Sequence, residues 1–284
     1  MRFALLTLLV GFVSVAAAAG EEPNVQSASS RPQITVIIDD LGYSLSAGRR
    51  TIKLPGPVVC AVLPRTPRGD LLARLAMQNG KEVLLHLPLQ SSALPGAARE
   101  PGNITLDMNR TTFNETLAGN LDTVPFAIGI NGHKGSFLTR QPERMQWLME
   151  EVAARNLLFV DSYTTHLSVA LATARDAGVP SARRDVFLDS TVTTEHIARE
   201  FSRLKALARA QGSAVAIGHP HAETLTFLEA ELPTLEAQGF ELVGIQQLLK
   251  ARHAARHSAV RRETSRETAV TGARQVEPTP SASL

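Results

Sequence analysis

The sequence predicts an α/β fold built around a buried parallel sheet, and two patterns carry this prediction. Between residues 33 and 249, short apolar runs alternate with longer amphipathic runs, the order of strands and helices in α/β proteins. The short runs are continuous in Val, Ile and Leu, as expected of parallel strands covered on both faces. These patterns fit either a barrel or a doubly wound sheet.

The predicted elements follow one another in order along the chain. The strand candidates are the short apolar runs: Ile34–Ile38, Val58–Leu63, Glu82–Leu87, Phe126–Ile130, Leu157–Val160, Val186–Leu188 and Ala214–Ile217. The helix candidates are the amphipathic runs: Gly69–Gln78, Asn114–Leu121, Pro142–Arg155, Ser168–Ala177, Thr194–Ala210, Ala222–Glu236 and Gly244–Leu249. In the helix expected from Pro142, large apolar residues recur on one face at helical spacing.

The first 20 residues have the pattern of a signal peptide. Arg2 precedes an apolar run from Phe3 to Val15, and an Ala cluster ends at Gly20. The run is short for a membrane span, which needs ~20 apolar residues. We therefore favour a cleaved signal over a membrane anchor. The mature protein is expected to be exported, to the periplasm or the extracellular space, with no integral membrane span after cleavage.

The remaining chain divides by composition into a linker, a domain and a tail. Residues 21–32 are polar and Ser-rich, and residues 33–250 carry the α/β pattern. Residues 251–284 are rich in Arg, Ser, Thr and Pro with few large apolar residues, so we expect a disordered basic tail. The net charge of +2 is too small to indicate a nucleic-acid partner. The single cysteine, Cys60, lies in an apolar run and is expected to be a buried, inert thiol.

Polar residues follow the predicted strands at their carboxyl ends, where the active sites of α/β folds gather. They are Asp39, Asp40, His86, Asn131, His133, Asp161, Ser162, Asp189, His219 and His221. If the strands are parallel, these side chains share one rim. An Asp after a strand is often a helix N-cap, an alternative that is open for Asp161 and favoured for Asp189. His86, in an apolar run, has the alternative of a hydrogen-bonded core residue.

A rim of Asp and His indicates metal-assisted hydrolysis. A divalent ion such as zinc takes imidazole nitrogen and carboxylate oxygen, often three ligands from the protein, and keeps a position open for water. A carboxylate can then act as the base and an imidazole as the acid. The sequence has no G-x-S-x-G elbow, P-loop or G-x-G-x-x-G motif. Adjacent carboxylates such as Asp39 and Asp40 are poorly placed to flank a glycosidic bond.

Six segments in this order resemble the divergent polysaccharide deacetylase family: VIIDDLGYS, EVLLHLPLQ, GINGHKGS, FVDSYT, RDVFLD and AIGHPHAETL. The resemblance covers roughly residues 34–249. It implies a distorted (β/α) barrel of about seven parallel strands. It also implies the activity of the larger superfamily, which removes N- or O-acetyl groups from sugars with the help of a metal.

The resemblance also implies roles for particular residues. Asp39 corresponds to the base, Asp40 and His86 to metal ligands, and His219 to the general acid. His133 is the candidate for the remaining imidazole ligand.

The expected supporting or substrate-binding positions are Asn131, Asp161 and His221. Gln90 stands where the family usually has Glu, and Gly132 and Lys134 also depart from its pattern.

We therefore expect an exported metal-dependent hydrolase, with zinc as the first candidate ion, that deacetylates a cell-envelope or exported polysaccharide. The alternative is a catalytically inactive carbohydrate- or envelope-binding protein on the same barrel, suggested by the three departures.

Overall fold

The computed structural model describes residues 31–92 and 100–258. The predicted signal peptide, most of the predicted linker, and residues 259–284 of the predicted tail lie outside the described residues. Within the described part of the chain, no helix has the length and apolar character needed to cross a membrane.

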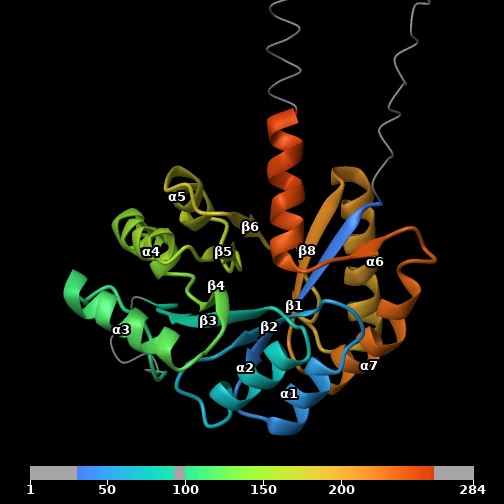
Figure 1. The fold of residues 1–284 in the computed structure, drawn as a ribbon, viewed down its shortest axis with the longest axis horizontal. Helices are drawn as coiled ribbons and strands as arrows, with labels where there is room; N and C mark the ends of the chain where they lie inside the picture. Colours follow the sequence, from blue (N-terminus) through green and yellow to red (C-terminus); the bar gives the residue numbers. More distant parts are fainter. Residues whose placement is uncertain (1–30, 93–99, 259–284) are drawn as a thin grey trace, which may run out of the picture. The chain divides into compact units, whose positions relative to one another are not determined.

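The described residues form one sheet of nine parallel strands (Figure 1). The strands are β1 Gln33–Leu41, β2 Val59–Val62, β3 Val83–Leu89, β4 Ala127–Lys134, β5 Leu158–Asp161, β6 Ser181–Arg183, β7 Val186–Phe187, β8 Ser213–Gly218 and β9 Glu241–Leu242. All the predicted strands are present. The sequence missed β6 and β9, neither of which is a continuous run of apolar residues.

The sheet curls into an open barrel. Its strand order is β6-β5-β4-β3-β2-β1-β8-β7, with β9 added beside β1. The two outermost strands, β6 and β7, are separated in the chain by only Arg184 and Asp185. Because consecutive Cα atoms are about 3.8 Å apart, the two edges of the sheet must approach each other. The predicted distorted barrel is confirmed, and the doubly wound alternative is wrong.

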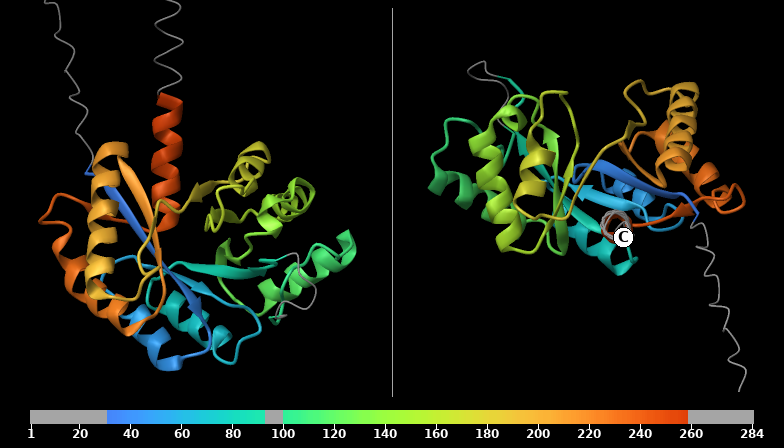
Figure 2. Two further views of the ribbon diagram at one scale, coloured as in Figure 1. Left: turned by 180° about the vertical axis from the view of Figure 1, so that it is seen from behind. Right: turned by 90° about the horizontal axis from the view of Figure 1, so that it is seen from above.

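Helices cover the outer face of the sheet (Figure 2). They are α1 Leu45–Ile52, α2 Gly69–Gln78, α3 Arg110–Asp122, α4 Pro142–Ala154, α5 Ala170–Asp176, α6 Thr194–Gln211 and α7 Ala222–Glu231, with 3-10 turns at Leu138–Arg140 and Leu232–Thr234. The sequence missed α1. It also predicted α7 through Glu236, whereas the α-helix ends at Glu231 and passes into the 3-10 turn that contains Pro233.

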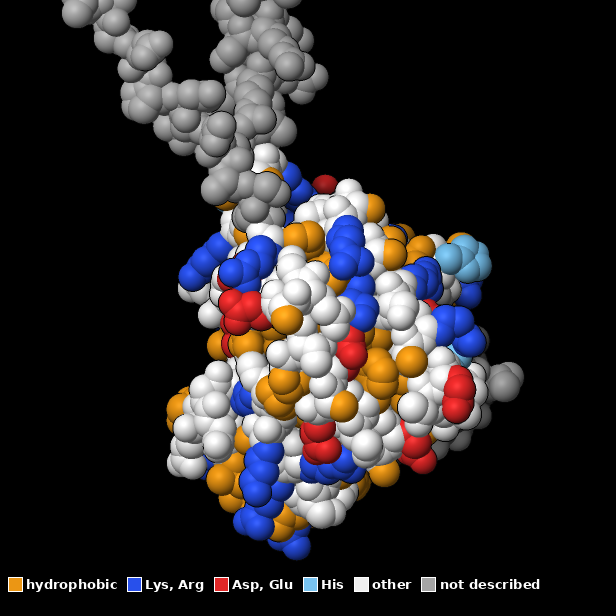
Figure 3. Space-filling view, turned by 90° about the vertical axis from the view of Figure 1, so that its right-hand side faces the viewer, with side chains coloured by type: hydrophobic (Ala, Val, Ile, Leu, Met, Phe, Trp, Pro, Cys, Tyr) orange, Lys and Arg blue, Asp and Glu red, His pale blue; other side chains and the backbone are white. Residues whose placement is uncertain are grey.

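Charged side chains of both signs lie on the outer side of α6 and α7. On the side of the molecule that carries α6 and α7, Lys and Arg side chains are interspersed with Asp and Glu (Figure 3). Lys205 of α6 pairs with Glu231 of α7 at 2.7 Å, and Arg50 of α1 pairs with Glu229 of α7 at 2.7 Å. These pairs link α6 and α1 to α7.

A last helix, residues 245–258, closes the inner side of the sheet. Ile245, Leu248 and Leu249 are buried there, and the Glu82 carboxylate accepts the backbone N–H of Ile245 at 2.5 Å. The helix continues past residue 250, where the sequence predicted the tail to begin. Arg252 extends the contact by donating to Ser213 Oγ at 2.8 Å. Residues 251–258 of the predicted disordered tail are therefore helical.

The alternation of side chains along the strands creates two separate layers. Outward residues such as Ile38 and Leu85 pack with the helices, whereas inward residues such as Ile37 and Leu84 form a second apolar cluster with the 245–258 helix. Two positions beyond Ile37 and Leu84 on the same face are Asp39 and His86, both buried. The inner layer thus changes from apolar to polar toward the carboxyl ends of the strands.

We predict that the thiol of Cys60 is unreactive in the native protein. Cys60 lies fully buried in β2, and burial raises its pKa to about 12, so the nucleophilic thiolate is almost absent at neutral pH. Labelling with a thiol reagent should be complete in urea-unfolded protein and undetectable over the same period in native protein. Stoichiometric labelling of the native protein at the unfolded rate would show that this strand is not packed as described.

Candidate functional site

A β-bulge turns both carboxylates at the end of β1 toward the site. The pairing of β1 with β2 runs from Ile38 opposite Cys60 to Leu41 opposite Val62, so Asp39 and Asp40 together oppose one residue. Asp40 also has φ of +58°, in the left-handed region that Asp tolerates better than most residues. In a regular strand, adjacent side chains would point to opposite faces. The bulge and the left-handed conformation of Asp40 let the side chains of Asp39 and Asp40 reach one site.

Three side-chain atoms that could ligate a metal converge in the site, each from a different strand. Asp40 Oδ1 lies 3.2 Å from His86 Nε2 and 2.9 Å from His133 Nδ1. The two imidazole nitrogens are 3.1 Å apart. Zinc ligands bond at about 2.0–2.2 Å, so donor atoms roughly 3.0–3.4 Å apart can share one ion. The observed triangle is within or close to this range.

Hydrogen bonds on the far sides of the rings orient the imidazoles. His86 Nδ1–H donates to Asn131 Oδ1 at 2.9 Å, and His133 Nε2–H donates to Glu100 Oε2 at 3.0 Å. With those protons on the outer nitrogens, both inner nitrogens present lone pairs to Asp40. Asp40 Oδ1 is buried and has no hydrogen-bond donor among the described residues. Three electron-rich atoms facing one another fit a divalent cation.

A proton can take the place of a cation between Asp40 and the two imidazoles. Burial opposes ionisation of Asp40, but an imidazole of His133 or His86 that gains a proton on its inner nitrogen can donate to Asp40, and these hydrogen bonds and charges hold the pKa of Asp40 well below its usual value. Burial likewise disfavours the charged form of His86, yet Asp39 and Asp40 raise its pKa. Without a cation, the site therefore attracts a proton onto an imidazole.

Asp39 is held apart from this triangle. Its carboxylate is buried and accepts from Asn131 Nδ2 at 2.7 Å, while His86 Nε2 lies 3.6 Å away. Burial raises the pKa of Asp39 despite the nearby His86 and His219. Asn131 thus links Asp39 to His86 by donating to one and accepting from the other.

His219 approaches the site from the end of β8 and is fixed by Asp189. His219 Nδ1–H donates to Asp189 Oδ1 at 3.0 Å, and the backbone N–H of His219 and the Thr224 hydroxyl donate to Asp189 Oδ2. The other ring nitrogen, Nε2, lies 3.8 Å from Asp40 Oδ2. Burial disfavours the charged imidazole, but the hydrogen bond and charge of Asp189 raise the pKa of His219.

Asp189 is not a helix N-cap, because Thr193 caps α6. The sequence favoured the N-cap role and missed the contact with His219. Two further residues were missed. Glu100 bonds His133, and the guanidinium of Arg184 donates to the carbonyls of Ser162 and Tyr163. The charge of Arg184 also interacts with those of Asp39 and Asp161. Arg184 is the first residue of the segment RDVFLD, so its place in that segment could have identified it as a site residue.

Two of the expected supporting residues do not reach the triangle. Asp161 accepts from the Tyr163 N–H at 2.8 Å and the Ser168 hydroxyl at 2.9 Å, and so braces the loop after β5. It is not the N-cap of α5, a position held by Val169. His221 is exposed at the start of α7, with its ring centroid 5.9 Å from that of His219.

Asp189, His219 and His221 are also close enough to share an ion. The oxygens of Asp189 are already used by His219 and Thr224, which leaves the triangle of Asp40, His86 and His133 as the better-suited group.

The family departures lie outside the triangle. Gln90 accepts from the Leu106 N–H at 2.8 Å and donates to the Ser92 carbonyl at 2.6 Å, so its amide joins two loop segments. Lys134 pairs with Glu100.

A cavity of about 330 Å³ opens beside the triangle and gives it access to solvent. Its lining includes the charged or polar residues Asp40, Glu100, His133 and Lys134 together with apolar residues such as Leu63. The cavity can therefore take a ligand that combines polar and apolar groups.

The sequence matches one protein family and is related to two bacterial proteins. The sequence profile of the family described as divergent polysaccharide deacetylase matches residues 36–249. An uncharacterized protein of Haemophilus influenzae is 32% identical over 219 residues, 77% of each chain. The uncharacterized protein YibQ of Escherichia coli is 34% identical over 197 residues, which span 69% of this chain and 61% of YibQ.

A solved structure has the same fold. The crystal structure of the uncharacterized protein ATU2773 from Agrobacterium tumefaciens superposes with a TM-score of 0.74 at 22% identity, over 78% of this chain and 91% of that one.

We predict that Asp189→Asn lowers the pKa of His219. The substitution removes the negative charge that favours the imidazolium, so we expect the pKa of His219 to fall. The measurement is an NMR titration of His ring protons in metal-free protein, with His219→Gln used to assign the signal. An unchanged titration in a variant that keeps its melting temperature would contradict the assigned pairing.

Proposed function

Because the chain belongs to the divergent polysaccharide deacetylase family, we propose that it is an exported, metal-dependent hydrolase. In this proposal it removes acetyl groups from a cell-envelope or exported polysaccharide. The observation that carries it is the convergence of Asp40, His86 and His133, whose donor atoms lie 2.9–3.2 Å apart with their lone pairs facing inward. Export rests on the signal-peptide pattern of residues 1–20.

The three converging side chains would hold a divalent ion, with zinc the first candidate for two imidazoles and a carboxylate. Such an ion polarises a carbonyl and lowers the pKa of water, which is the activation that amide or ester hydrolysis requires. Asn131 and Glu100 hold the two imidazoles with a lone pair toward the ion. The mixed lining of the adjoining cavity supports binding of an acetylated sugar, because the acetyl methyl is apolar and its carbonyl is polar.

Asp39 is the proposed general base. It lies beside the triangle without belonging to it, and its raised pKa makes it a stronger proton acceptor than an ordinary carboxylate. Asn131 Nδ2–H donates to Oδ1 of Asp39 and leaves Oδ2 toward the site.

His219 is the proposed general acid. Asp189 takes the hydrogen bond of Nδ1 and stabilises the protonated ring, so Nε2 can deliver a proton to the leaving group.

The alternative of an inactive binding protein was suggested by Gln90, Gly132 and Lys134. The amide of Gln90 is engaged by the Leu106 N–H and the Ser92 carbonyl, and Lys134 pairs with Glu100. The triangle of Asp40, His86 and His133 is complete without them, which supports retaining catalysis. Release of acetate, or its absence in a metal-loaded protein that still binds glycan, decides between the two functions.

We predict about one divalent ion per chain in the mature protein. The double variant His86→Ala, His133→Ala should lose it, because two of three ligands are removed. His166→Ala, which changes an exposed histidine, is the matched control and should keep the ion. Metal content is measured by mass spectrometry after dialysis against zinc. Equal metal content in the double variant and the control would exclude this triangle as the site.

We predict that Asp39→Asn keeps the metal but lowers kcat for acetate release about 100-fold or more, the usual contribution of a general base. The assay uses acetylated chito-oligosaccharides and intact peptidoglycan, with enzymatic detection of acetate. Gln90→Glu serves as a control that should retain activity. Full activity of Asp39→Asn, or of wild-type protein stripped with a chelator, would contradict the proposed mechanism.

A further inference from the structure

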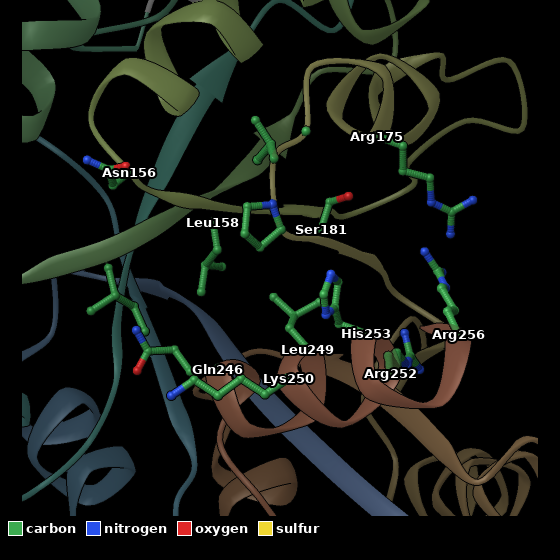
Figure 4. Close-up of a pocket in the computed structure, with 14 residues that line it drawn as sticks. Asn156, Leu158, Arg175, Ser181, Gln246, Leu249, Lys250, Arg252, His253 and Arg256 are labelled. Atoms are coloured by element: carbon green, nitrogen blue, oxygen red, sulfur yellow. The ribbon is translucent and has the colours of Figure 1, made fainter. Parts of the chain in front are cut away.

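A second, larger cavity lies near the other end of the strands. Its volume is about 690 Å³, and Figure 4 shows residues from several segments around it. Ile128, at the beginning of β4, and Leu158, the first residue of β5, line this cavity. His133 of the candidate active site lies near the end of β4. At about 3.3 Å per residue, Ile128 and His133 are roughly 16 Å apart along the strand. The two sites are therefore distinct.

Four arginines, here called the arginine cluster, surround this cavity and an adjoining one of about 330 Å³: Arg175, Arg183, Arg252 and Arg256. Arg175, Arg252 and Arg256 line both cavities. Arg175 comes from the end of α5, and Arg252 and Arg256 come from the 245–258 helix. In Figure 4 the side chains of Arg175 and Arg256 point toward one another from opposite walls.

The arginine cluster has little compensating negative charge. Among the ion pairs of residues 31–92 and 100–258, only Asp185, 3.5 Å from Arg252, reaches it. Arg183 lies over the ring of Tyr163, 4.4 Å from its centroid. Within the same residues, Arg175 and Arg256 have no ion pair. Burial and the charges of Arg256 and Arg183 lower the pKa of Arg175, as expected of cations that repel one another.

The remaining wall of the cavity is apolar. Ile128, Leu158, Val179 and Leu249 lie beside the arginines, and all but Ile128 are buried. Leu249 belongs to the inner apolar cluster, with Ile128 packed against that cluster. A ligand in this cavity would thus meet unpaired guanidinium groups on one side and a hydrocarbon surface on the other.

We propose that this cavity binds an organic phosphate. The phosphate group would lie between Arg175 and Arg256, whose planar donor arrays match phosphate oxygens, and the attached organic group would lie on the apolar wall. An anion between these two guanidinium groups adds two attractions that offset their mutual repulsion. A phospholipid headgroup and a soluble phosphorylated compound share this chemistry. The proposal is independent of the deacetylase function, because no residue of the candidate active site takes part.

The test compares two double variants of equal charge in the mature protein. Arg175→Gln, Arg256→Gln removes the facing pair, whereas Arg68→Gln, Arg140→Gln removes two exposed arginines elsewhere. Calorimetry with glycerol 3-phosphate and with soluble dihexanoyl-phosphatidylglycerol measures binding. We expect the facing-pair variant to bind roughly tenfold more weakly or worse, as for loss of charge-assisted hydrogen bonds, and the control variant to bind like wild type. Melting temperatures establish that both variants are folded.

Sedimentation with vesicles of phosphatidylglycerol, against vesicles of phosphatidylcholine, separates the two sources of phosphate. Binding to the anionic vesicles that is lost in the facing-pair variant assigns a lipid headgroup. Binding of glycerol 3-phosphate alone, lost in the same variant, assigns a soluble compound. Equal binding of each probe by all three proteins, or binding of no probe by wild type, would overturn the proposal.

Discussion

Two adjacent carboxylates at the end of a buried strand lose solvation on folding and repel each other, so the surrounding groups must stabilise them. Asp40 is held ionised by His86 and His133. Asp39 is stabilised by a hydrogen bond from Asn131 and keeps a raised pKa. The β-bulge that places both carboxylates at one site therefore also divides their chemistry, one facing two imidazoles and the other accepting a single amide donor.

The curled sheet makes this arrangement possible because its inner face is divided along the strands. Nearer the amino ends of the strands, apolar residues such as Ile37 and Leu84 fill the inner face, and the 245–258 helix covers them. The backbone N–H of Ile245, at the start of that helix, donates to Glu82. The polar site residues lie at the carboxyl ends of the same strands, and the packing of the inner apolar cluster fixes the register of those strands. The same covering helix carries Arg252 and Arg256, so the element that completes the core also forms one wall of the arginine-lined cavity.

The strands and the rim of polar residues were predictable because each depends on a local pattern. A β-branched run followed by Asp39 and Asp40 indicates a strand end without any knowledge of the rest of the fold. The partners were not predictable in this way. Glu100 meets His133 and Asp189 meets His219 only after segments far apart in the sequence are brought together, and Asp189 alone looks like a helix N-cap. The end of the last helix was missed because its apolar pattern stops at Leu249.

The most direct test of the metal site is a crystal structure of the mature protein soaked in zinc, with an anomalous difference map. We expect one strong peak within about 2.0–2.2 Å of Asp40 Oδ1, His86 Nε2 and His133 Nδ1. We also expect His219 to remain bonded to Asp189. A map with no peak in the triangle, or with its main peak between Asp189, His219 and His221, would contradict the account.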